Sequence, residues 1–203
     1  AIAAVGAVPV FVGVTEDLVI DLDDLAAKAD QADVLLLSHM RGHICDMDRL
    51  LALCGATDIK IIEDCAHTSG SMYKGKRLGL WGDISCFSFE EKKLMTTGDG
   101  GMICSNDLEL LKDIRAMRWV GKDKDNWKTA QSYTDLNKYA YHWFYELNIL
   151  GWKYNMNDLA ASIGIAQLNK LNEMNERRSE IIKIYMNGIK ELENIKSIDR
   201  KSV

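Results

Sequence analysis

The sequence predicts an α/β domain in which helices cover a mostly parallel sheet, and three observations support this fold class. Short apolar runs alternate with segments of helical periodicity along most of the chain. The run Val34–Leu37 is continuously apolar, which is typical of a strand covered on both faces. Polar residues follow two other runs, at Glu63–Asp64 and Lys92–Lys93, as expected for ligand-binding loops at the carboxyl edge of such a sheet.

Five apolar runs are expected to form strands, and four segments are expected to form helices. The strands are Val8–Val12, Val34–Leu37, Ile59–Ile62, Ile84–Phe89 and Met102–Cys104. Pro9, the only proline, lies near the start of its strand, where a missing N–H is tolerated. The helices are Asp21–Lys28, Asp46–Cys54, a segment from Asn106 or Asp107 to about Arg118, and a segment from Asn157 or Asp158 to about Leu192 that is broken near 169–172.

Between residues 121 and 148 charged residues give way to aromatic ones, concentrated from Trp127 to Tyr145. Tyrosine and tryptophan combine apolar area with a polar tip, so this tract is suited to an interface or a substrate wall. A loop that folds over its own small core explains it equally well.

The composition argues against several classes of partner. The net charge of −5 disfavours nucleic acid and anionic membranes. No apolar run approaches the ~20 residues of a membrane-spanning helix, and no signal peptide is recognised. The five cysteines are odd in number and include no Cys-x-x-Cys, which favours reduced thiols in a cytoplasmic protein. The four histidines are scattered, so no metal site is expected.

Two residues point to chemistry. Lys93 follows the apolar run Ile84–Phe89 and precedes two threonines and a glycine cluster, where an amine can be partly removed from water. Asp64 directly follows another strand, so both side chains are expected at one edge of the sheet. A lysine that holds an aldehyde as an imine and an aspartate that protonates a pyridine nitrogen are what a pyridoxal phosphate enzyme requires. A solvated Lys-Lys turn is the alternative.

Seven blocks extend this pattern over nearly the whole chain: Gly42-His-Ile-Cys-Asp-Met-Asp48, Glu63-Asp-Cys-Ala-His67, Tyr73-Lys-Gly-Lys-Arg-Leu-Gly79, Gly82-Asp-Ile-Ser-Cys-Phe-Ser-Phe89, Thr96-Thr-Gly-Asp-Gly-Gly-Met102, Gly151-Trp-Lys-Tyr-Asn-Met-Asn-Asp158 and Ala160-Ala-Ser-Ile-Gly-Ile-Ala-Gln-Leu168. With them the chain resembles the DegT/DnrJ/StrS family of pyridoxal-phosphate-dependent aminotransferases, most of which act on sugars. The resemblance implies the three-layer, mostly parallel large domain of the aspartate aminotransferase fold (fold type I).

The resemblance also implies a domain division. Residues 1–120 would belong to the large domain that binds pyridoxal phosphate. Residues 121–156 would connect it to residues 157–203, which hold interdomain helices and the start of the small C-terminal domain. A glycine-threonine phosphate turn and a ring-stacking aromatic are expected upstream of this text. We therefore expect a piece truncated at both ends, which alone would be inactive.

The family motifs assign roles to four residues of the first part. Lys93 would form the Schiff base with the cofactor and later move the proton. Asp64 would lie under the pyridine nitrogen, His67 near the ring and its 3-oxygen, and Ser88 at the phosphate. Some relatives carry histidine in place of this lysine and dehydrate their sugar, so Lys93 favours transamination.

The family segment that matches Gly151–Asn155 crosses a homodimer interface to the cofactor phosphate of the partner. The family more often has tyrosine and asparagine where this chain has Trp152 and Lys153. Lys153 can bind phosphate as a point charge, and Asn155 is a second candidate. The resemblance therefore implies a homodimer with shared active sites.

The expected activity is transfer of an amino group, from glutamate, to a keto sugar nucleotide or a related keto-cyclitol, as in polysaccharide biosynthesis. Two alternatives stay open: a sugar dehydratase of the same fold, and a regulator that keeps the fold without catalysis. The sequence does not specify the sugar, its carbon or the stereochemistry.

Overall fold

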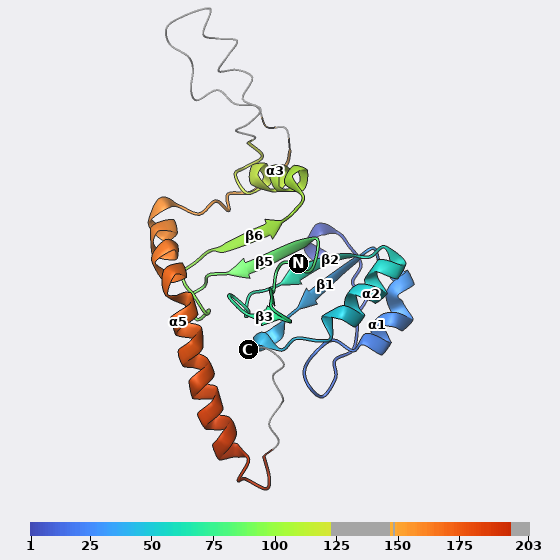
Figure 1. Ribbon diagram of the computed structural model, residues 1–203. Coiled ribbons are helices and arrows are strands. Elements are labelled where there is room, and N and C mark those ends of the chain that lie inside the picture. The colour runs from blue at the N-terminus through green and yellow to red at the C-terminus, as the bar shows by residue number, and fades with distance from the viewer. Residues whose placement is uncertain (123–146, 148, 196–203) are drawn as a thin grey trace, which may run out of the picture. The chain divides into compact units, whose positions relative to one another are not determined.

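The computed structural model describes residues 1–122, 147 and 149–195. The chain forms two compact units, one from Ala1–Cys104 with Asp158–Val203 and the other from Ser105–Asn157. The first unit contains a mostly parallel sheet with helices packed on it, which confirms the predicted α/β class (Figure 1). The division at residues 120 and 156 stays a prediction, and the aromatic tract 127–145 lies outside the described residues.

Four strands form the sheet, in the order β1-β2-β5-β6. Their bounds are Val34–Ser38 for β1, Lys60–Asp64 for β2, Ile84–Ser88 for β5 and Gly101–Ser105 for β6. Strands β1, β2 and β5 are parallel, and the arrow of β6 points opposite to that of β5 in Figure 1. A separate antiparallel hairpin joins β3 (Met72–Tyr73) to β4 (Lys76–Arg77). The carboxyl ends of β2 and β5 therefore lie at one edge of the sheet.

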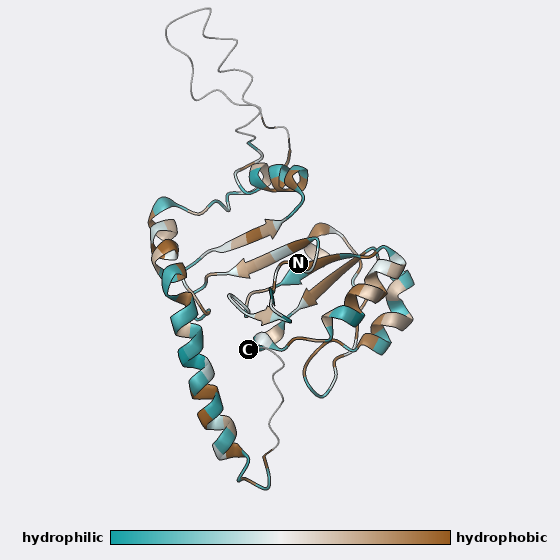
Figure 2. Cartoon of the chain, in the orientation of Figure 1, coloured by the Kyte–Doolittle hydropathy of each residue, from teal (hydrophilic) through white to brown (hydrophobic). Residues whose placement is uncertain are grey.

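Two helices, α1 (Leu22–Lys28) and α2 (Met47–Thr57), pack against the sheet and against each other. Asp21 and Asp46 cap them by accepting hydrogen bonds from backbone N–H groups of the first turn. The core between helices and sheet includes Leu25, Leu37, Met47, Leu50 and Ile61. Figure 2 shows that the strands are among the most apolar elements. The remaining elements are 3₁₀ helices η1 (Ala3–Val5), η2 (Ala29–Gln31) and η3 (Met40–Gly42), and, in the second unit, α3 (Leu108–Met117).

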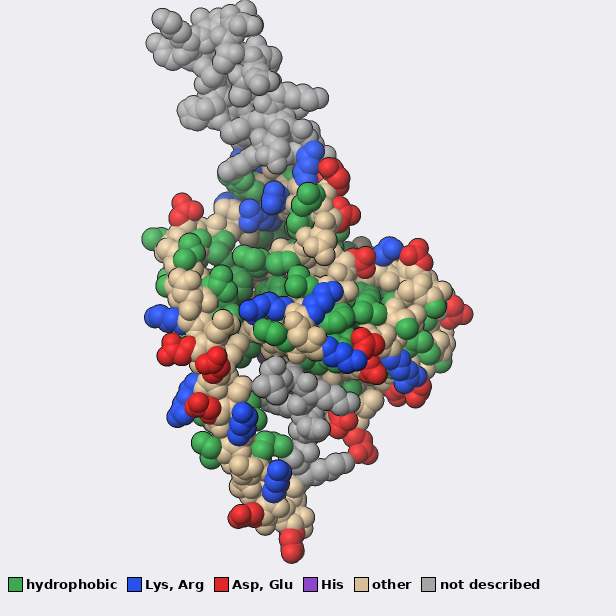
Figure 3. Space-filling view, in the orientation of Figure 1, with side chains coloured by type: hydrophobic (Ala, Val, Ile, Leu, Met, Phe, Trp, Pro, Cys, Tyr) green, Lys and Arg blue, Asp and Glu red, His purple; other side chains and the backbone are tan. Residues whose placement is uncertain are grey.

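The opposite face of β1 is open, since Val34 and Leu36 are 49% and 42% exposed. Figure 3 likewise shows hydrophobic side chains at the surface of the molecule. Among the described residues, no helix is both long and apolar enough to span a bilayer.

Helix α5 (Asp158–Ile189) is continuous, so the predicted break near 169–172 is wrong. Contacts with residues 69–70 of the same unit hold the helix through this region. Leu171 is buried and packs against Gly70, and Asn175 Nδ2 donates to the Ser69 carbonyl at 3.0 Å. Asparagine has only a modest helix-propensity cost, which such contacts can offset.

The strand predicted at Val8–Val12 is also wrong, because this segment joins no β-ladder. Side chains of α1 bind the backbone here instead of a neighbouring strand. Lys28 Nζ donates to the Phe11 carbonyl at 2.9 Å, and the Gly13 N–H donates to Asp24 Oδ2 at 2.6 Å. The apolar pattern identified an extended segment but not its lack of a partner.

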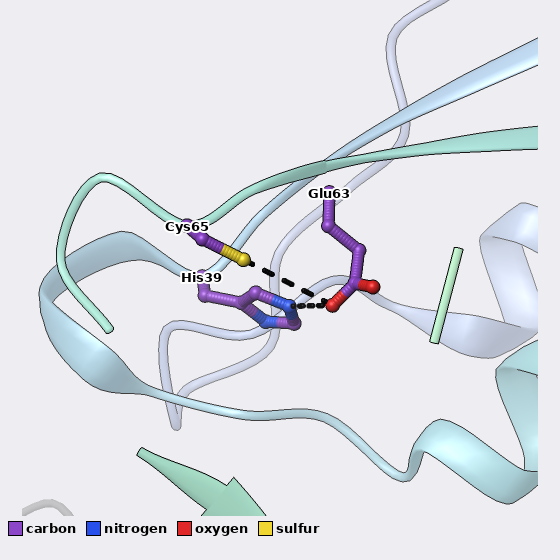
Figure 4. A group of neighbouring side chains, drawn as sticks. All are labelled: His39, Glu63 and Cys65. Carbon is purple, nitrogen blue, oxygen red and sulfur yellow. Dashed lines mark hydrogen bonds and ion pairs between the residues drawn. The ribbon is translucent and has the colours of Figure 1, made fainter. Parts of the chain in front are cut away.

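A buried carboxylate ties the sheet to the loop that precedes β5. Glu63 on β2 is completely buried, and its carboxylate accepts four hydrogen bonds from nitrogen donors and a longer one from Cys65 Sγ at 4.0 Å. Its Oε1 accepts from the N–H groups of Trp81 and Gly82 at 2.7 and 2.6 Å. Its Oε2 accepts from the Gly79 N–H at 2.9 Å and lies 3.2 Å from His39 Nε2 (Figure 4). We call these contacts the Glu63 clamp.

The charge of Glu63 is held by its donors. Burial alone would raise the pKa of this carboxyl, but the hydrogen bonds from His39 and the three backbone N–H groups outweigh burial and lower its pKa. The carboxylate is thus a charged hydrogen-bond acceptor inside the core.

The same carboxylate lies near His39 and Cys65, and the three side chains offer potential metal-ligand atoms within 4.8 Å of one another (Figure 4). Burial raises the pKa of the Cys65 thiol to about 12. Both oxygens of Glu63 already accept hydrogen bonds. The chemistry of this group fits a structural clamp rather than a metal centre.

The clamp predicts a large stability loss for Glu63→Gln. In either orientation of the new amide, its NH₂ group would face two donors that now bind a carboxylate oxygen. We expect the full-length protein to lose roughly 2–4 kcal/mol of unfolding free energy, measured by urea denaturation. Glu91→Gln is the matched control, because the Glu91 side chain is 69% exposed. Equal unfolding midpoints for the two variants would contradict the clamp.

Candidate active site

Two neighbouring acidic residues of β2, Glu63 and Asp64, lie on opposite faces of the sheet. Because side chains alternate along a strand, neighbouring Glu63 and Asp64 point to opposite faces of β2. Glu63 faces the core, and Asp64 faces the open side. Asp64 is in register with Ser38 on β1 and with Cys86 on β5. These three residues therefore lie side by side on the open face.

Both oxygens of the Asp64 carboxylate accept a hydrogen bond. Ser38 Oγ donates to Oδ2 at 3.0 Å, and the Ala66 N–H donates to Oδ1 at 3.1 Å. The strand ends are also joined through the backbone, since the His39 N–H donates to the Asp64 carbonyl at 3.1 Å. Asp64 is thus a half-buried, oriented carboxylate at the carboxyl edge of the sheet.

The loop after β5 is closed at its base by Phe89. The Phe89 carbonyl accepts from the Thr97 N–H at 2.9 Å and from Thr96 Oγ1 at 3.1 Å, and its N–H donates to the Gly100 carbonyl at 2.9 Å. Gly98 and Gly100 have φ of +81° and +136°, which other residues rarely adopt. The segment Thr96–Gly100 therefore forms a tight loop that closes back onto Phe89, with the two lysines inside the closed stretch.

The structure distinguishes the two neighbouring lysines. Lys93 is half-buried, and its Nζ lies 3.4 Å from His67 Nε2. The side chain of Lys92 is 82% exposed and lies near Glu91. Lys93, the lysine predicted to be reactive, is thus also the lysine that faces His67, another predicted site residue.

Lys93 and Asp64 shift the pKa of His67 in opposite directions. Burial lowers the pKa of the imidazole, the positive charge of Lys93 lowers it further, and Arg41 adds to this effect, while Asp64 opposes it. The imidazole is therefore neutral at pH 7. An ammonium can only donate hydrogen bonds, so a contact with charged Lys93 requires an unprotonated His67 Nε2.

Arg41 belongs to the same edge of the sheet. It follows β1 and adopts a left-handed backbone conformation, with φ of +53°. Such a conformation is uncommon for a residue other than glycine. Its guanidinium contributes positive charge near His67.

Ser88 lies two residues after Cys86 on β5, so it shares the open face with Asp64. Its Oγ accepts a long hydrogen bond from the Glu90 N–H at 3.4 Å. The first unit therefore brings Asp64, His67, Ser88 and Lys93 to one edge of the sheet.

Lys153 and Asn155 belong to the second unit. Lys153 Nζ donates to Asn155 Oδ1 at 2.5 Å. The backbone of Lys153 forms an isolated bridge with Trp119. Their predicted contact with a phosphate stays a prediction.

Two functional contacts escaped the sequence interpretation: the Glu63 clamp and the hydroxyl of Ser38. A signal for Glu63 existed, because Ile61, Glu63 and Cys65 alternate with the outward residues of β2 and so share its buried face. For Ser38 no local signal exists, since its partner is set by the register between β1 and β2.

The donor set fits pyridoxal phosphate. An oriented carboxylate suits a protonated pyridine nitrogen, a half-buried amine suits an aldehyde, and a serine hydroxyl suits a phosphate.

Comparisons with known proteins agree with this chemistry. The family model of the DegT/DnrJ/EryC1/StrS aminotransferase family matches residues 1–202. The chain is 38% identical to an uncharacterized protein of Methanocaldococcus jannaschii over 92% of its length and 47% of the relative. It is 34% identical to GDP-perosamine synthase of Escherichia coli O157:H7 over 95% of its length and 49% of that enzyme. It thus spans about half the length of these curated relatives.

Two solved structures have the same fold. The aminotransferase TlmJ of Streptoalloteichus hindustanus matches the whole chain, and 52% of its own chain is covered, with a TM-score of 0.84 and 30% identity. A sugar aminotransferase of Streptococcus pneumoniae, in its PMP form, matches 93% of this chain and 49% of its own, with a TM-score of 0.78 and 29% identity. The chain belongs to the DegT/DnrJ/EryC1/StrS aminotransferase family.

Proposed function

We propose that the full-length protein is a pyridoxal-phosphate-dependent sugar aminotransferase. It transfers an amino group from glutamate to a keto sugar nucleotide or a related keto-cyclitol. The main support is the half-buried Lys93 amine, which lies against a neutral His67 at the sheet edge that carries Asp64. Similarity to GDP-perosamine synthases supports a sugar acceptor.

Four residues of the first unit would hold the cofactor. Asp64 would bind the pyridine nitrogen and keep it protonated through its negative charge. His67 would bind the 3-oxygen, and the Ser88 hydroxyl would donate to the phosphate. Lys93 would bind the aldehyde carbon. When bound, pyridoxal phosphate supplies an aldehyde that condenses with amines and a ring that withdraws electrons.

Lys93 would also carry out the proton transfer. Once free, its amine would take the proton from Cα of the amino donor and would deliver it to the cofactor carbon that carried the aldehyde. Neutral His67 favours this role because it accepts a hydrogen bond from the amine without adding positive charge. The loop closed at Phe89 would hold the amine in place for this role.

Two residues of the second unit, Lys153 and Asn155, would complete the phosphate site. Lys153 and Asn155 would contact the cofactor phosphate of a partner subunit, in a cytoplasmic homodimer with shared active sites. The pairing of these two side chains is consistent with a preformed polar group for an anion.

Replacing the two lysines separately tests the central assignment. Lys93→Ala should abolish the yellow absorption of the protein loaded with pyridoxal phosphate and lower the half-reaction rate with glutamate by roughly 10³-fold or more. Lys92→Ala should keep both, because its side chain is exposed. Absorption spectra and single-turnover kinetics of the full-length protein measure this. The reverse pattern would show that the assignment is wrong.

Incubation with glutamate tests the reaction class. A transaminase should convert its bound cofactor to the pyridoxamine form, seen as loss of the yellow band and stoichiometric release of 2-oxoglutarate. A protein that stays yellow while dehydrating a sugar nucleotide would instead be a dehydratase. A protein that never takes up the cofactor would be a non-catalytic relative.

His67 predicts a pH dependence of stability. Folding lowers the pKa of this imidazole below 6.5, so the unfolded state binds its proton more readily. Its contribution to stability is therefore present above about pH 6.5 and lost as the pH falls through the folded-state pKa. As the pH falls from about 7 to about 5, the unfolding free energy of His67→Gln should decrease less than that of the wild type. Urea denaturation of both proteins without cofactor measures this. Parallel curves would contradict the shift.

A further inference from the structure

We propose that Ser38 is a positioning residue for Asp64: its hydroxyl locks the carboxylate in the orientation that the pyridine nitrogen requires. This inference rests on the proposed function, since it concerns how the same site binds its cofactor. Ser38 itself does not contact the reacting atoms in this account.

The register between two strands creates the contact. Ser38 is the last residue of β1, Asp64 is the last residue of β2, and the two are paired across the parallel ladder. Paired residues of neighbouring strands point to the same face. Ser38 Oγ therefore lies beside the Asp64 carboxylate and donates to Oδ2 at 3.0 Å.

The second oxygen of the carboxylate is held independently. The Ala66 N–H donates to Oδ1 at 3.1 Å, so each oxygen accepts one hydrogen bond. The terminal torsion of an aspartate is otherwise broad, and one hydrogen bond leaves the carboxylate free to rotate about it. Two bonds on different oxygens fix the carboxylate plane, while further lone pairs stay available for a protonated nitrogen.

The donor is itself rigidly placed. On the backbone, the His39 N–H binds the Asp64 carbonyl at 3.1 Å. On the opposite face, the His39 ring contacts Glu63 Oε2 at 3.2 Å. Both neighbours of Ser38 along the chain, Leu37 and His39, are buried. The end of β1 is thus tied to the end of β2 on both sides of Ser38.

A purely structural role does not explain the hydroxyl of Ser38. The residue is exposed on the open face, so it contributes no buried area to the core. Among the described residues, its Oγ has no hydrogen-bond partner other than Asp64. Removing it should change the site and leave the fold intact.

The test compares three variants of the full-length protein with the wild type. Ser38→Ala removes the hydroxyl, and Ser38→Thr restores it with a side chain that suits a strand. Thr57→Val is the control, because it removes a hydroxyl that binds carbonyls of its own helix α2, those of Leu53 and Cys54. The readouts are the dissociation constant for pyridoxal phosphate by absorbance titration, the half-reaction with glutamate, and the urea midpoint without cofactor.

For Ser38→Ala we expect about tenfold weaker binding of pyridoxal phosphate, since one hydrogen bond to a charged group is lost. The half-reaction rate at saturating glutamate should fall by a similar factor, about tenfold, with KM for glutamate within about twofold of the wild type. Ser38→Thr should restore both properties. Urea midpoints of all variants should match that of the wild type.

Four results would overturn the inference. A Ser38→Ala variant that binds the cofactor and reacts like the wild type would leave the proposed function standing but remove the role of Ser38. A lowered urea midpoint for Ser38→Ala, or a failure of Ser38→Thr to restore binding, would assign Ser38 a structural role only. A wild-type protein that takes up no pyridoxal phosphate would overturn this inference and the proposed function together.

Discussion

The arrangement of the first unit depends on one buried carboxylate, that of Glu63. It joins three segments that are distant in sequence: the end of β1 through His39, β2 itself, and the loop through Gly79 and Trp81 that leads into β5. A charge in the core is tolerated only because every donor around it is in place. The clamp thereby aligns the carboxyl ends of the strands that carry the candidate site.

Because side chains alternate along a strand, the buried position of Glu63 also determines where Asp64 points. With Glu63 directed into the core, the next residue, Asp64, must face the open side of the sheet. Two adjacent acidic residues thus have separate roles: one stabilises the fold, and the other is free to bind a ligand. The loop closed on Phe89 acts in the same way for the lysines, since it leaves Lys92 in solvent and directs Lys93 toward His67.

Local patterns predicted most of the fold, and long-range register explains what they missed. Asp107 caps its helix, as one of the two predicted candidates, and four of the five predicted strands exist. The strand at Val8–Val12 failed because an apolar pattern does not reveal whether a partner strand is present. The site residues Asp64 and Lys93 were found through their position after strands, whereas the Ser38–Asp64 contact depends on a pairing that no single segment encodes.

The most direct measurement concerns the attachment point of the cofactor. Reduction of the loaded full-length protein with borohydride, followed by digestion and mass spectrometry, identifies the lysine that is linked to pyridoxal phosphate. The account predicts that the phosphopyridoxyl group is found on Lys93. Its presence on Lys92 or elsewhere, or its absence from the peptides of this chain, would contradict the account.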